Sequence, residues 1–479
     1  MDYVFHSKPF AHQEEVFLRT RDLPKFGLFW EQGTAKTKPT LDTAAYLYET
    51  GKITGLLVIA PNGVHRNWVT DEVKAHWPTR VPLTTFVFNS DKAGTKRSQE
   101  QAEEILRAPG LALLAMTYDG FLTKAGRSLG ERFLARRPSL FVLDEAHRIK
   151  SPGAKRTKAL LAASKYAPYR RVLTGTPIAN GPFDAYSIMK FLDLEFWKPF
   201  YLDSFFVFKH HFGIFKQGNG VGGQQYEYVV AYRHLDQLEK HLATCSSRVT
   251  KDQVLDLPPK LYSNRYFELN SEQKRVYKDL EEEFMTFLGG DLVTAPLAIT
   301  RLLRLQQVTS GYLPSDAGDP IYDLGDDNPR LRLLEEVIED CPHKAIIWAK
   351  FTRDIDKIME LLGNRAVRYD GKVGNDERAK NKEAFQNGDK QFFVCNLMIN
   401  EGLTLHAART VIYYNNSFKL TDRLQSEDRA HRLGQKHPVN YIDLVAQDTV
   451  DEHIVESLVK KHDIAGRILG DEIRKWLRK

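Results

Sequence analysis

Short apolar runs alternate with amphipathic stretches along most of this 479-residue chain, and this alternation limits the possible folds more than any other feature. Runs that are apolar on both faces are typical of parallel strands covered by helices. The alternation occurs twice, before residue 180 and again after residue 330. It predicts an α/β protein with two doubly wound lobes. The runs are 27–30, 56–60, 85–88, 111–116, 140–143 and 171–173, then 345–349, 366–369, 392–395, 411–414 and 441–445.

The segment between the two parts, about 181–330, breaks this alternation. Residues 183–211 are rich in aromatic side chains and are predicted to be mostly helical. Five glycines within 213–223 could be mistaken for a phosphate loop, but 226–232 then reads as a strand, whereas a phosphate loop leads into a helix. A β-hairpin is therefore predicted. Amphipathic helices are predicted over 271–288 and 296–308, and a loop over 313–329.

These patterns divide the chain into three regions. We expect a first lobe over 1–255, with a helical and hairpin protrusion at about 181–235. A linker and a second helical protrusion are expected over 256–330. A second lobe is expected over 331–479, ending in a brace helix.

Composition narrows the class of protein. The formal charge of +6 is compatible with an anionic partner but is equally typical of a slightly basic enzyme. The three cysteines, Cys245, Cys341 and Cys395, are isolated, so neither a disulfide framework nor a zinc site is indicated. We see neither a secretory signal nor an apolar run long enough to span a bilayer. We therefore expect a monomeric protein in a reducing, cytoplasmic compartment, without a membrane partner.

A candidate phosphate site follows the first apolar run. Trp30 ends that run, and Gly33-Thr34-Ala35-Lys36-Thr37 precede a helix predicted over 40–48. A strand, a glycine-bearing turn and a helix aim backbone N–H groups at phosphate. We expect Lys36 on the β- and γ-phosphates of a nucleotide and the Thr37 hydroxyl on Mg²⁺. Trp30 and Ala35 occupy the two glycine positions of the GxxxxGK[ST] pattern, so an ordinary turn with an exposed lysine is the alternative.

Two carboxylates follow another apolar run. Asp144 and Glu145 come directly after Leu-Phe-Val-Leu, at the carboxyl end of a predicted strand, where ligands bind in open α/β sheets. We expect Asp144 to hold Mg²⁺ and Glu145 to orient and deprotonate an attacking water. The alternative is an exposed acidic start of a helix.

Two arginines near the end of the chain supply positive charge. Arg429 and Arg432 are three residues apart, so on a helix they share one face, with Gln435 nearby. A guanidinium that reaches the transferring phosphoryl group speeds hydrolysis by about 10³–10⁵-fold. We therefore expect both arginines and Gln435 at the nucleotide. The alternative is a solvated basic helix.

Together these segments resemble the Swi/Snf-type ATPases of helicase superfamily two, of the compact bacterial or phage kind. The resemblance runs over most of the chain, and the ordered set of motifs is more specific than any one of them. The matching segments are EQGTAKT (31–37), PNGVHRNWVTDEVKAHWP (61–78), LDEAHRIKS (143–151), RVLTGTPIAN (171–180), RVTKDQVLDLPPK (248–260), KAIIWAKF (344–351), YDG…ER (369–378), NEGLTLHAA (400–408), DRLQSEDRAHRLGQ (422–435) and VNYIDLVAQDTVDEHIVE (439–456).

The resemblance implies two RecA-like lobes, ATP and Mg²⁺ as cofactors, and DNA as partner. It implies that Gln13 reads the adenine edge and that Gly33, Thr34 and Ala35 line the nucleotide. Thr174-Gly175-Thr176 would couple the phosphate state to DNA contact. The candidate DNA contacts are Pro61, Asn62, Asn67, Thr117 and Thr174 in the first lobe, and Thr404 and Ser417 in the second.

The chain departs from the family pattern at several positions. Ala35 replaces a glycine before the motif lysine, Ile399 and Asn400 replace glycines, and Phe418 replaces tryptophan. These changes affect the expected turnover and DNA contacts. The basic residues Arg474, Lys475, Arg478 and Lys479 could brace the lobes or touch DNA, or could form a solvated tail.

We expect an ATP-dependent translocase or helicase that moves along double-stranded or branched DNA, with branch migration or fork remodelling as possible activities. One alternative is a helicase that unwinds RNA or single strands. Another is an ATP-gated clamp with little turnover, which Ala35 favours.

Overall fold

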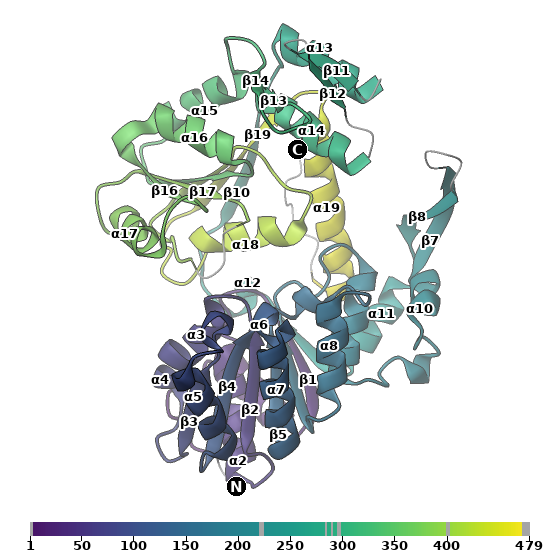
Figure 1. Cartoon of the computed structure of the whole chain (residues 1–479), viewed down its shortest axis with the longest axis vertical. Helices are drawn as coiled ribbons and strands as arrows, with labels where there is room; N and C mark the ends of the chain where they lie inside the picture. Colours follow the sequence, from purple (N-terminus) through teal and green to yellow (C-terminus); the bar gives the residue numbers. More distant parts are fainter. Residues whose placement is uncertain are drawn as a thin grey trace. The chain divides into compact units, whose positions relative to one another are not determined.

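The computed structural model describes residues 3–219, 225–282, 285–288, 291–294, 298–398 and 403–471. The chain forms two compact units (Figure 1). The first unit holds the residues up to Leu255 together with a C-terminal segment that begins at Asp463. The second unit runs from Asp256 to His462. Residues 256–330 thus group with the second unit, whereas the segment from Asp463 groups with the first.

Seven parallel strands form the sheet of the first unit, in the order β3-β4-β2-β5-β6-β1-β9. All six apolar runs predicted as strands are confirmed. The run placed at 85–88 is β3, Leu83–Val87. The edge strand β9 was not predicted, because its sequence Ser-Ser-Arg-Val lacks an apolar run. The other strands are β1 (Lys25–Trp30), β2 (Gly55–Ala60), β4 (Leu111–Thr117), β5 (Ser139–Asp144), β6 (Tyr169–Leu173) and β9 (Ser246–Val249).

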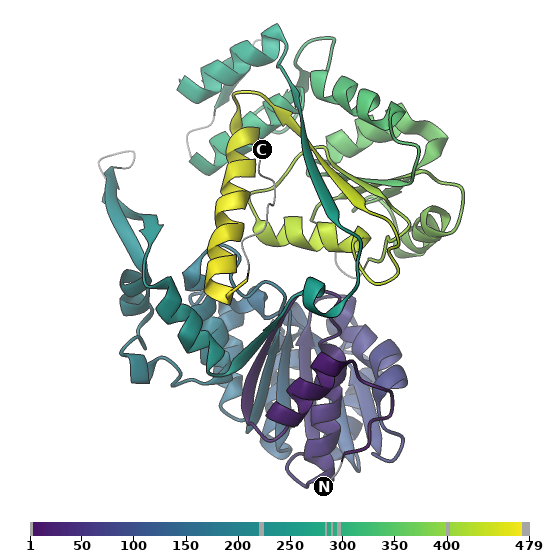
Figure 2. The same ribbon diagram turned by 180° about the vertical axis from the view of Figure 1, so that it is seen from behind.

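Helices cover both faces of this sheet. α1 (Ala11–Thr20) and α2 (Thr37–Glu49) pack on one face, where Phe17 and Leu41 join the buried core (Figure 2). α5, α7 and α8 lie on the opposite face (Figure 1). The remaining helical segments of the unit are α3 (Val64–Asn67), α4 (Val73–His76), α5 (Lys96–Arg107), α6 (Tyr118–Leu122), α7 (Lys124–Arg136), α8 (Lys155–Ser164), α9 (Ala185–Leu192), α10 (Phe205–Phe212), α11 (Leu235–Ala243) and α12 (Lys251–Val254).

The hairpin predicted from the glycine-rich segment is confirmed. β7 (Gly213–Asn219) and β8 (Gln225–Tyr232) pair in antiparallel fashion between α10 and α11.

Six parallel strands form the sheet of the second unit, in the order β10-β19-β18-β15-β17-β16. The five predicted runs are confirmed, and both faces are buried. The edge strand β10 was missed, because its sequence mixes polar and apolar residues and contains no apolar run; Leu261, Ser263 and Arg265 are exposed. The strands are β10 (Lys260–Phe267), β15 (Ala345–Ala349), β16 (Ala366–Tyr369), β17 (Phe392–Asn396), β18 (Thr410–Tyr413) and β19 (Val439–Ala446). The helices are α15 (Pro329–Glu339), α16 (Thr352–Leu362), α17 (Asn375–Gln386), α18 (Leu420–Ala430) and α19 (Val450–Leu469), whose last turns, from Asp463, group with the first unit.

The second protrusion corrects two predictions. The helix placed over 271–288 ends earlier, as α13 (Ser271–Glu282), and β11 (Met285–Leu288) pairs with β12 (Asp291–Thr294). Two glycines separate these strands in the sequence, a pattern that favours a hairpin over a continued helix. The second predicted helix is α14 (Ala298–Thr309). The predicted loop over 313–329 contains parts of a small hairpin, β13 (Tyr312–Pro314) with β14 (Ile321–Asp323).

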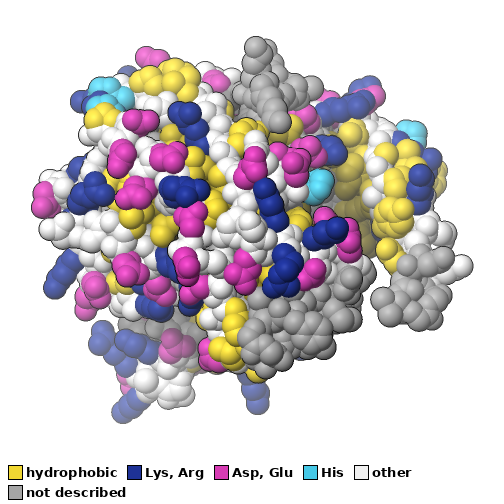
Figure 3. Space-filling view, turned by 90° about the horizontal axis from the view of Figure 1, so that it is seen from above, with side chains coloured by type: hydrophobic (Ala, Val, Ile, Leu, Met, Phe, Trp, Pro, Cys, Tyr) yellow, Lys and Arg dark blue, Asp and Glu magenta, His cyan; other side chains and the backbone are white. Residues whose placement is uncertain are grey.

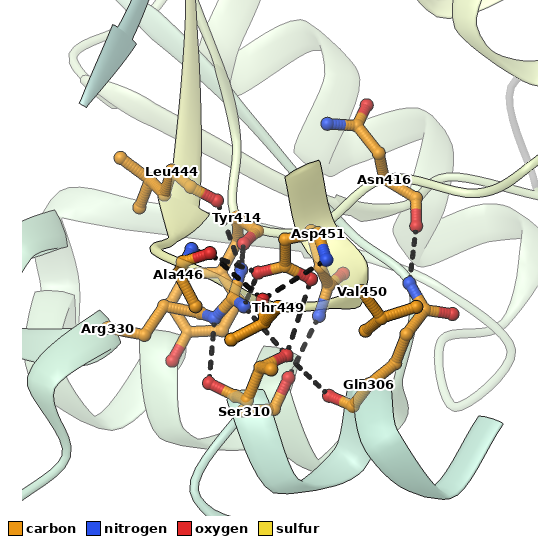
Figure 4. A network of polar contacts seen from close by, with 12 residues as sticks. Gln306, Ser310, Arg330, Tyr414, Asn416, Leu444, Ala446, Thr449, Val450 and Asp451 are labelled. Atoms are coloured by element: carbon orange, nitrogen blue, oxygen red, sulfur yellow. Dashed lines mark hydrogen bonds and ion pairs between the residues drawn. The ribbon is translucent and has the colours of Figure 1, made fainter. Parts of the chain in front are cut away.

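A buried polar network joins the second protrusion to the sheet of its unit (Figure 4). The Arg330 side chain is fully buried and donates to the backbone oxygens of Thr309, Tyr414 and Leu444. It also pairs with the Asp451 carboxylate at the start of α19. Because the guanidinium contacts α14, β19 and α19 together, these elements are held as one structure.

A second buried ion cluster fixes β10 against α18. The Glu427 carboxylate is fully buried and accepts from Arg423 Nε at 2.8 Å, Lys260 Nζ at 3.0 Å and the Tyr262 hydroxyl at 2.8 Å. Burial alone would raise the pKa of Glu427, but the charges of Lys260 and Arg423 lower it to about 2.

Replacing Glu427 by glutamine should destabilise the second unit by up to about 3–5 kcal/mol at neutral pH, because buried Arg423 and half-buried Lys260 each lose one carboxylate partner. Arg423 keeps its pair with Asp443 and Lys260 keeps its pair with Asp428, which lowers the loss. The folded pKa of Glu427 lies below its unfolded value of 4.5. The charge therefore stabilises above that value, and its contribution is lost as the pH falls toward about 2. Guanidinium denaturation across this range measures the effect, with the exposed Glu456→Gln as control. A difference between wild type and variant that stays constant down to acid pH would contradict this explanation.

Candidate active site

The predicted phosphate loop and the two carboxylates lie at the same edge of the first sheet. β5 ends at Asp144, and β1 ends at Trp30, where the loop begins. All strands of this sheet are parallel, and only β6 separates β5 from β1. The carboxyl ends of these strands therefore bring residues about 110 positions apart together.

Side chains of α1 hydrogen-bond to the loop between β1 and α2. Gln13 is buried and donates through Nε2 to the Ala35 carbonyl at 2.9 Å, while its Oε1 accepts from the Phe10 N–H. The His12 ring nitrogen lies 3.0 Å from the Thr34 carbonyl. Gly33 and Ala35 are exposed, and both have positive φ, 83° and 58°. Positive φ at these two positions shapes the turn ahead of the α2 N-terminus, the order of elements that phosphate binding uses.

Lys36 is the buried cation of this loop. Its ammonium donates to the carbonyls of Trp30 at 2.9 Å and Glu31 at 3.1 Å. Its charge opposes the rise in the pKa of the Asp144 carboxyl that burial and the Glu145 charge cause. Thr37 begins α2 and is half-buried.

Asp144 is buried and constrained on three sides. Its Oδ2 accepts from the Trp68 indole N–H at 2.9 Å, and its Oδ1 accepts from the Glu145 N–H at 2.9 Å. The Tyr118 hydroxyl donates to its backbone oxygen at 2.8 Å. Burial and the neighbouring Glu145 charge raise the pKa of Asp144 to about 6. A cation bound at the same sheet edge would stabilise the charged form of this buried carboxylate.

Glu145 has φ of 52°, which is rare for a residue other than glycine. Its Oε1 accepts from Gln32 Nε2 at 3.0 Å, and its Oε2 lies 3.3 Å from His147 Nδ1. The strained backbone and these two contacts direct the carboxylate at the phosphate loop, from which Gln32 comes.

The sequence did not predict that Trp68 and Glu72 contribute to this site; both were noted only as part of the matching segment 61–78. Trp68–Glu72 forms a π-helical turn, a local feature frequent at functional sites. Burial and then the Asp144 charge raise the pKa of Glu72 to about 7. Glu72 is therefore a third acidic group near the two predicted carboxylates.

His147 connects the carboxylates to the Thr174-Gly175-Thr176 segment. Its Nδ1 lies 3.3 Å from the Thr174 hydroxyl and 3.5 Å from the Thr176 hydroxyl. The Thr176 N–H donates to the Thr174 hydroxyl at 3.2 Å. A chain of polar contacts thus runs from Glu145 to the segment after β6.

The candidate DNA contacts of the first unit follow the ends of three strands, β2, β4 and β6. Asn62 and Asn67 are exposed, whereas Pro61 is buried. The half-buried Thr117 caps α6 by accepting from the Gly120 N–H at 2.8 Å. Thr174 is fully buried, so in this structure its hydroxyl serves contacts within the unit.

In the second unit the two arginines converge on one loop. Arg429 and Arg432 both donate to the Leu403 carbonyl, each at 3.1 Å, and Arg432 also donates to the Thr404 hydroxyl at 2.9 Å. The prediction that both lie on one helix is wrong, because α18 ends at Ala430. His431 leaves the helical conformation, and Gly434 has φ of 102°.

Gln435 and Ser417 are buried and engaged within this unit. The Gln435 amide donates to the carbonyls of His406 at 3.0 Å and Ala408 at 2.8 Å, and it accepts from the N–H groups of Lys436 and His437. The Ser417 hydroxyl donates to Asp422 at 2.9 Å. Ile399, Asn400, Arg474, Lys475, Arg478 and Lys479 lie outside the described residues.

Two family models match the chain. The SNF2-related domain matches residues 27–309, and the helicase conserved C-terminal domain matches residues 329–434. This chain belongs to the SNF2-related family. The first match contains the phosphate loop and both carboxylates, and the second contains Arg429 and Arg432.

Relatives of this SNF2-related protein are large proteins. It is 27% identical over 456 residues to a chromodomain-helicase-DNA-binding protein 1-like of Danio rerio, covering 92% of this chain and 41% of that protein. It is 25% identical over 470 residues to the transcription regulatory protein SNF2 of Saccharomyces cerevisiae, covering 92% of this chain and 26% of that protein. The chain thus spans well under half of these relatives, and they lend no support to a bacterial or phage kind.

Among solved structures, the Sulfolobus solfataricus SWI2/SNF2 ATPase core in complex with dsDNA is similar, with 23% identity and a TM-score of 0.41. The match covers 99% of this chain and 95% of that one. Within the residues described, this SNF2-related chain has no helix of the length and apolarity needed to cross a membrane.

The phosphate loop of this SNF2-related chain has a strained backbone conformation at Ala35, and this strain can be tested. An alanine at φ of 58° costs about 1–2 kcal/mol relative to glycine. Ala35→Gly should therefore stabilise the protein by up to about 1 kcal/mol after the greater chain entropy of glycine is subtracted. Thermal melting measures this change. Ala154→Gly, where φ is −67°, should instead destabilise. If both variants shift the melting temperature alike, the loop stores no strain at Ala35.

Proposed function

We propose that this chain is an ATP-dependent motor that hydrolyses ATP and moves along double-stranded DNA. The observation that carries the proposal is the placement of the phosphate loop and the two carboxylates at one sheet edge, where Gln32 of the loop donates to Glu145. The two family matches support it, because together they contain all the residues assigned here to catalysis.

The phosphate loop would hold the nucleotide. Gly33 and Ala35 are exposed in the turn before the α2 N-terminus, so phosphate oxygens would accept from N–H groups of this turn. Lys36 would exchange its two carbonyl partners for phosphate oxygens. Gln13 would meet the adenine edge next to the loop that it supports.

Mg²⁺ fits the donor set at this edge. Asp144 and the Thr37 hydroxyl supply the hard oxygen ligands that this ion prefers, and burial together with the Glu145 charge raises the pKa of Asp144, which a bound cation would counter. When bound, the ion would neutralise charge on the phosphate oxygens. Glu145 would orient the attacking water and accept its proton.

The arginines of the second unit would complete the site. We propose that Arg429 and Arg432, held by the Leu403 carbonyl, reach the transferring phosphoryl group during turnover, with Gln435 securing the loop behind them. Negative charge on that group grows in the transition state, so guanidinium groups would stabilise it.

Hydrolysis would be coupled to DNA through His147. A change at Glu145 alters the partner of the His147 ring, which also contacts the hydroxyls of Thr174 and Thr176. Asn62, Asn67, Thr117 and Thr404 would contact DNA phosphates, and Pro61, Thr174 and Ser417 would shape the surfaces that carry them. Phosphate contacts carry little sequence information, which suits a motor that moves over any sequence. The Danio rerio relative is named as a helicase-DNA-binding protein, which supports DNA as partner.

The proposal is tested by measuring ATP hydrolysis with duplex DNA, a fork, a four-way junction, single-stranded DNA and RNA, with Lys36→Ala as the inactive control. Displacement of a triplex-forming strand then reports movement along duplex DNA. We expect duplex DNA to stimulate hydrolysis and movement, and preferential stimulation by forks or junctions would indicate remodelling of branched DNA. Stimulation by RNA or single strands alone would refute the duplex motor, and negligible turnover with every nucleic acid would indicate a clamp.

A further inference from the structure

The β7–β8 hairpin is exposed on the first unit, reaching away from α10 and α11 (Figure 1). Most of its described side chains are exposed. An isolated two-stranded ribbon is marginally stable in water, so this element needs an anchor, a ligand or both.

One face of the ribbon packs against the rest of the first unit and anchors the hairpin. The Phe215 and Tyr232 rings lie against Phe183, with ring centroids 6.2 Å and 5.6 Å away. Glu227 shares this face, because it is directly opposite Gln217, two residues beyond Phe215. Its carboxylate lies 3.4 Å from the Gln217 amide and 3.7 Å from His210.

The other face carries the tyrosines. Lys216 pairs with Tyr228 and Gly218 pairs with Tyr226 across the strands, so all four residues share this face. Tyr226 is 54% exposed and Tyr228 is 44% exposed. We call Lys216, Gly218, Tyr226 and Tyr228 the tyrosine face.

Gly218 makes room for the rings. A Cβ atom at this position would lie 3.0 Å from Tyr226 Cζ and 3.2 Å from Tyr228 Cε1. Both rings therefore lie close over the glycine backbone, and their centroids are 5.9 Å apart. The glycine backbone thus supports both rings, while much of each ring remains exposed. Exposed and supported aromatic rings of this kind can stack with nucleic-acid bases.

The charge of the ribbon favours an anionic ligand. From Phe205 to Arg233 the sequence has Lys209, Lys216 and Arg233 but one acidic residue, Glu227, which lies on the anchored face. Figure 3 shows hydrophobic side chains gathered beside Lys, Arg and His on the arm at its right edge, whereas acidic and basic side chains are interspersed over much of the rest of that view. A ligand with flat rings and negative charge fits both properties, and unpaired nucleotides have both.

We propose that the tyrosine face binds single-stranded nucleic acid, with unpaired bases stacked on Tyr226 and Tyr228 and the backbone next to Lys216. This contact is separate from the ATP site and from the duplex contacts proposed above, so it stands or fails without them. Stacking tolerates any base, so binding would be independent of sequence.

The test is the binding of fluorescently labelled single-stranded DNA to the full chain without ATP, followed by anisotropy. The double variant Tyr226→Ala/Tyr228→Ala should weaken binding by roughly 10- to 100-fold. Tyr226→Phe/Tyr228→Phe should keep wild-type affinity, because stacking needs the ring and not the hydroxyl. Tyr166→Ala, at another site with 50% exposure, is the matched control and should have no effect. Lys216→Ala should lower the salt slope of log affinity by about one.

Blunt duplex binding and the melting temperature of the double alanine variant should be unchanged, which separates a lost contact from a damaged fold. Unchanged single-strand affinity in the alanine variant would overturn the proposal and leave a protein as the ribbon's partner. An equal loss with blunt duplex, or an equal loss in the phenylalanine variant, would overturn it too. Labelled single-stranded RNA in the same assay distinguishes the two sources of unpaired bases.

Discussion

Replacing Arg432 by alanine should lower the maximal rate of DNA-stimulated ATP hydrolysis by about 10³–10⁵-fold. ATP affinity should change by less than about tenfold, because the guanidinium is proposed to act on charge that develops in the transition state. Arg432 shares the Leu403 carbonyl with Arg429 and also contacts the Thr404 hydroxyl, so its position is set before nucleotide arrives. Steady-state kinetics with saturating DNA measures kcat, and equilibrium binding of a fluorescent nucleotide measures affinity.

Two controls sharpen this prediction. Arg432→Lys keeps the charge but not the planar fork, so it should recover only part of the rate. Arg332→Ala removes a 59% exposed arginine of α15 in the same unit and should leave the rate unchanged. Loss of nucleotide affinity with an unchanged kcat would show that Arg432 binds the ground state rather than assisting hydrolysis.

Replacing Glu145 by glutamine should slow hydrolysis by about 10²–10⁴-fold while ATP stays bound. Glutamine retains the shape of the side chain but cannot accept a proton from water. Single-turnover hydrolysis measures the chemical step, and retention of labelled ATP on a filter measures binding.

The comparison for Glu145→Gln is Glu131→Gln, an exposed glutamate of α7 that pairs with Arg127. This variant should hydrolyse ATP at the wild-type rate. Wild-type turnover in Glu145→Gln would show that Glu145 does not accept the proton of the attacking water. Glu72, whose pKa the Asp144 charge raises, would then be the next candidate for this role.

The sheets could be predicted because buried parallel strands are apolar on both faces. Leu56–Ala60 and Ala345–Ala349, for example, are buried throughout. The edge strands β9 and β10 could not be found in this way, since they are covered less completely and keep polar side chains. The strands β11 and β12 were assigned to a helix or left unassigned because short apolar runs do not separate the two structures.

The residue types of the site could be predicted, but not their contacts. Lys36 and Asp144 follow strands that the sequence identifies, so the common edge is a consequence of topology. The Trp68–Asp144 hydrogen bond joins residues 76 positions apart, and nothing local in the sequence encodes it. α18 ends at Ala430, before Arg432, and helical spacing alone does not reveal this end.

The Arg330 network has a mechanical consequence for the second protrusion. A guanidinium with no exposed surface cannot exchange its partners for water, so tilting α14 would break several bonds at once. α14 is thus rigidly attached to the sheet of its unit, and its exposed Leu302 and Leu303 should move together with that sheet. A spectroscopic label at either leucine would report on the orientation of the second unit's sheet.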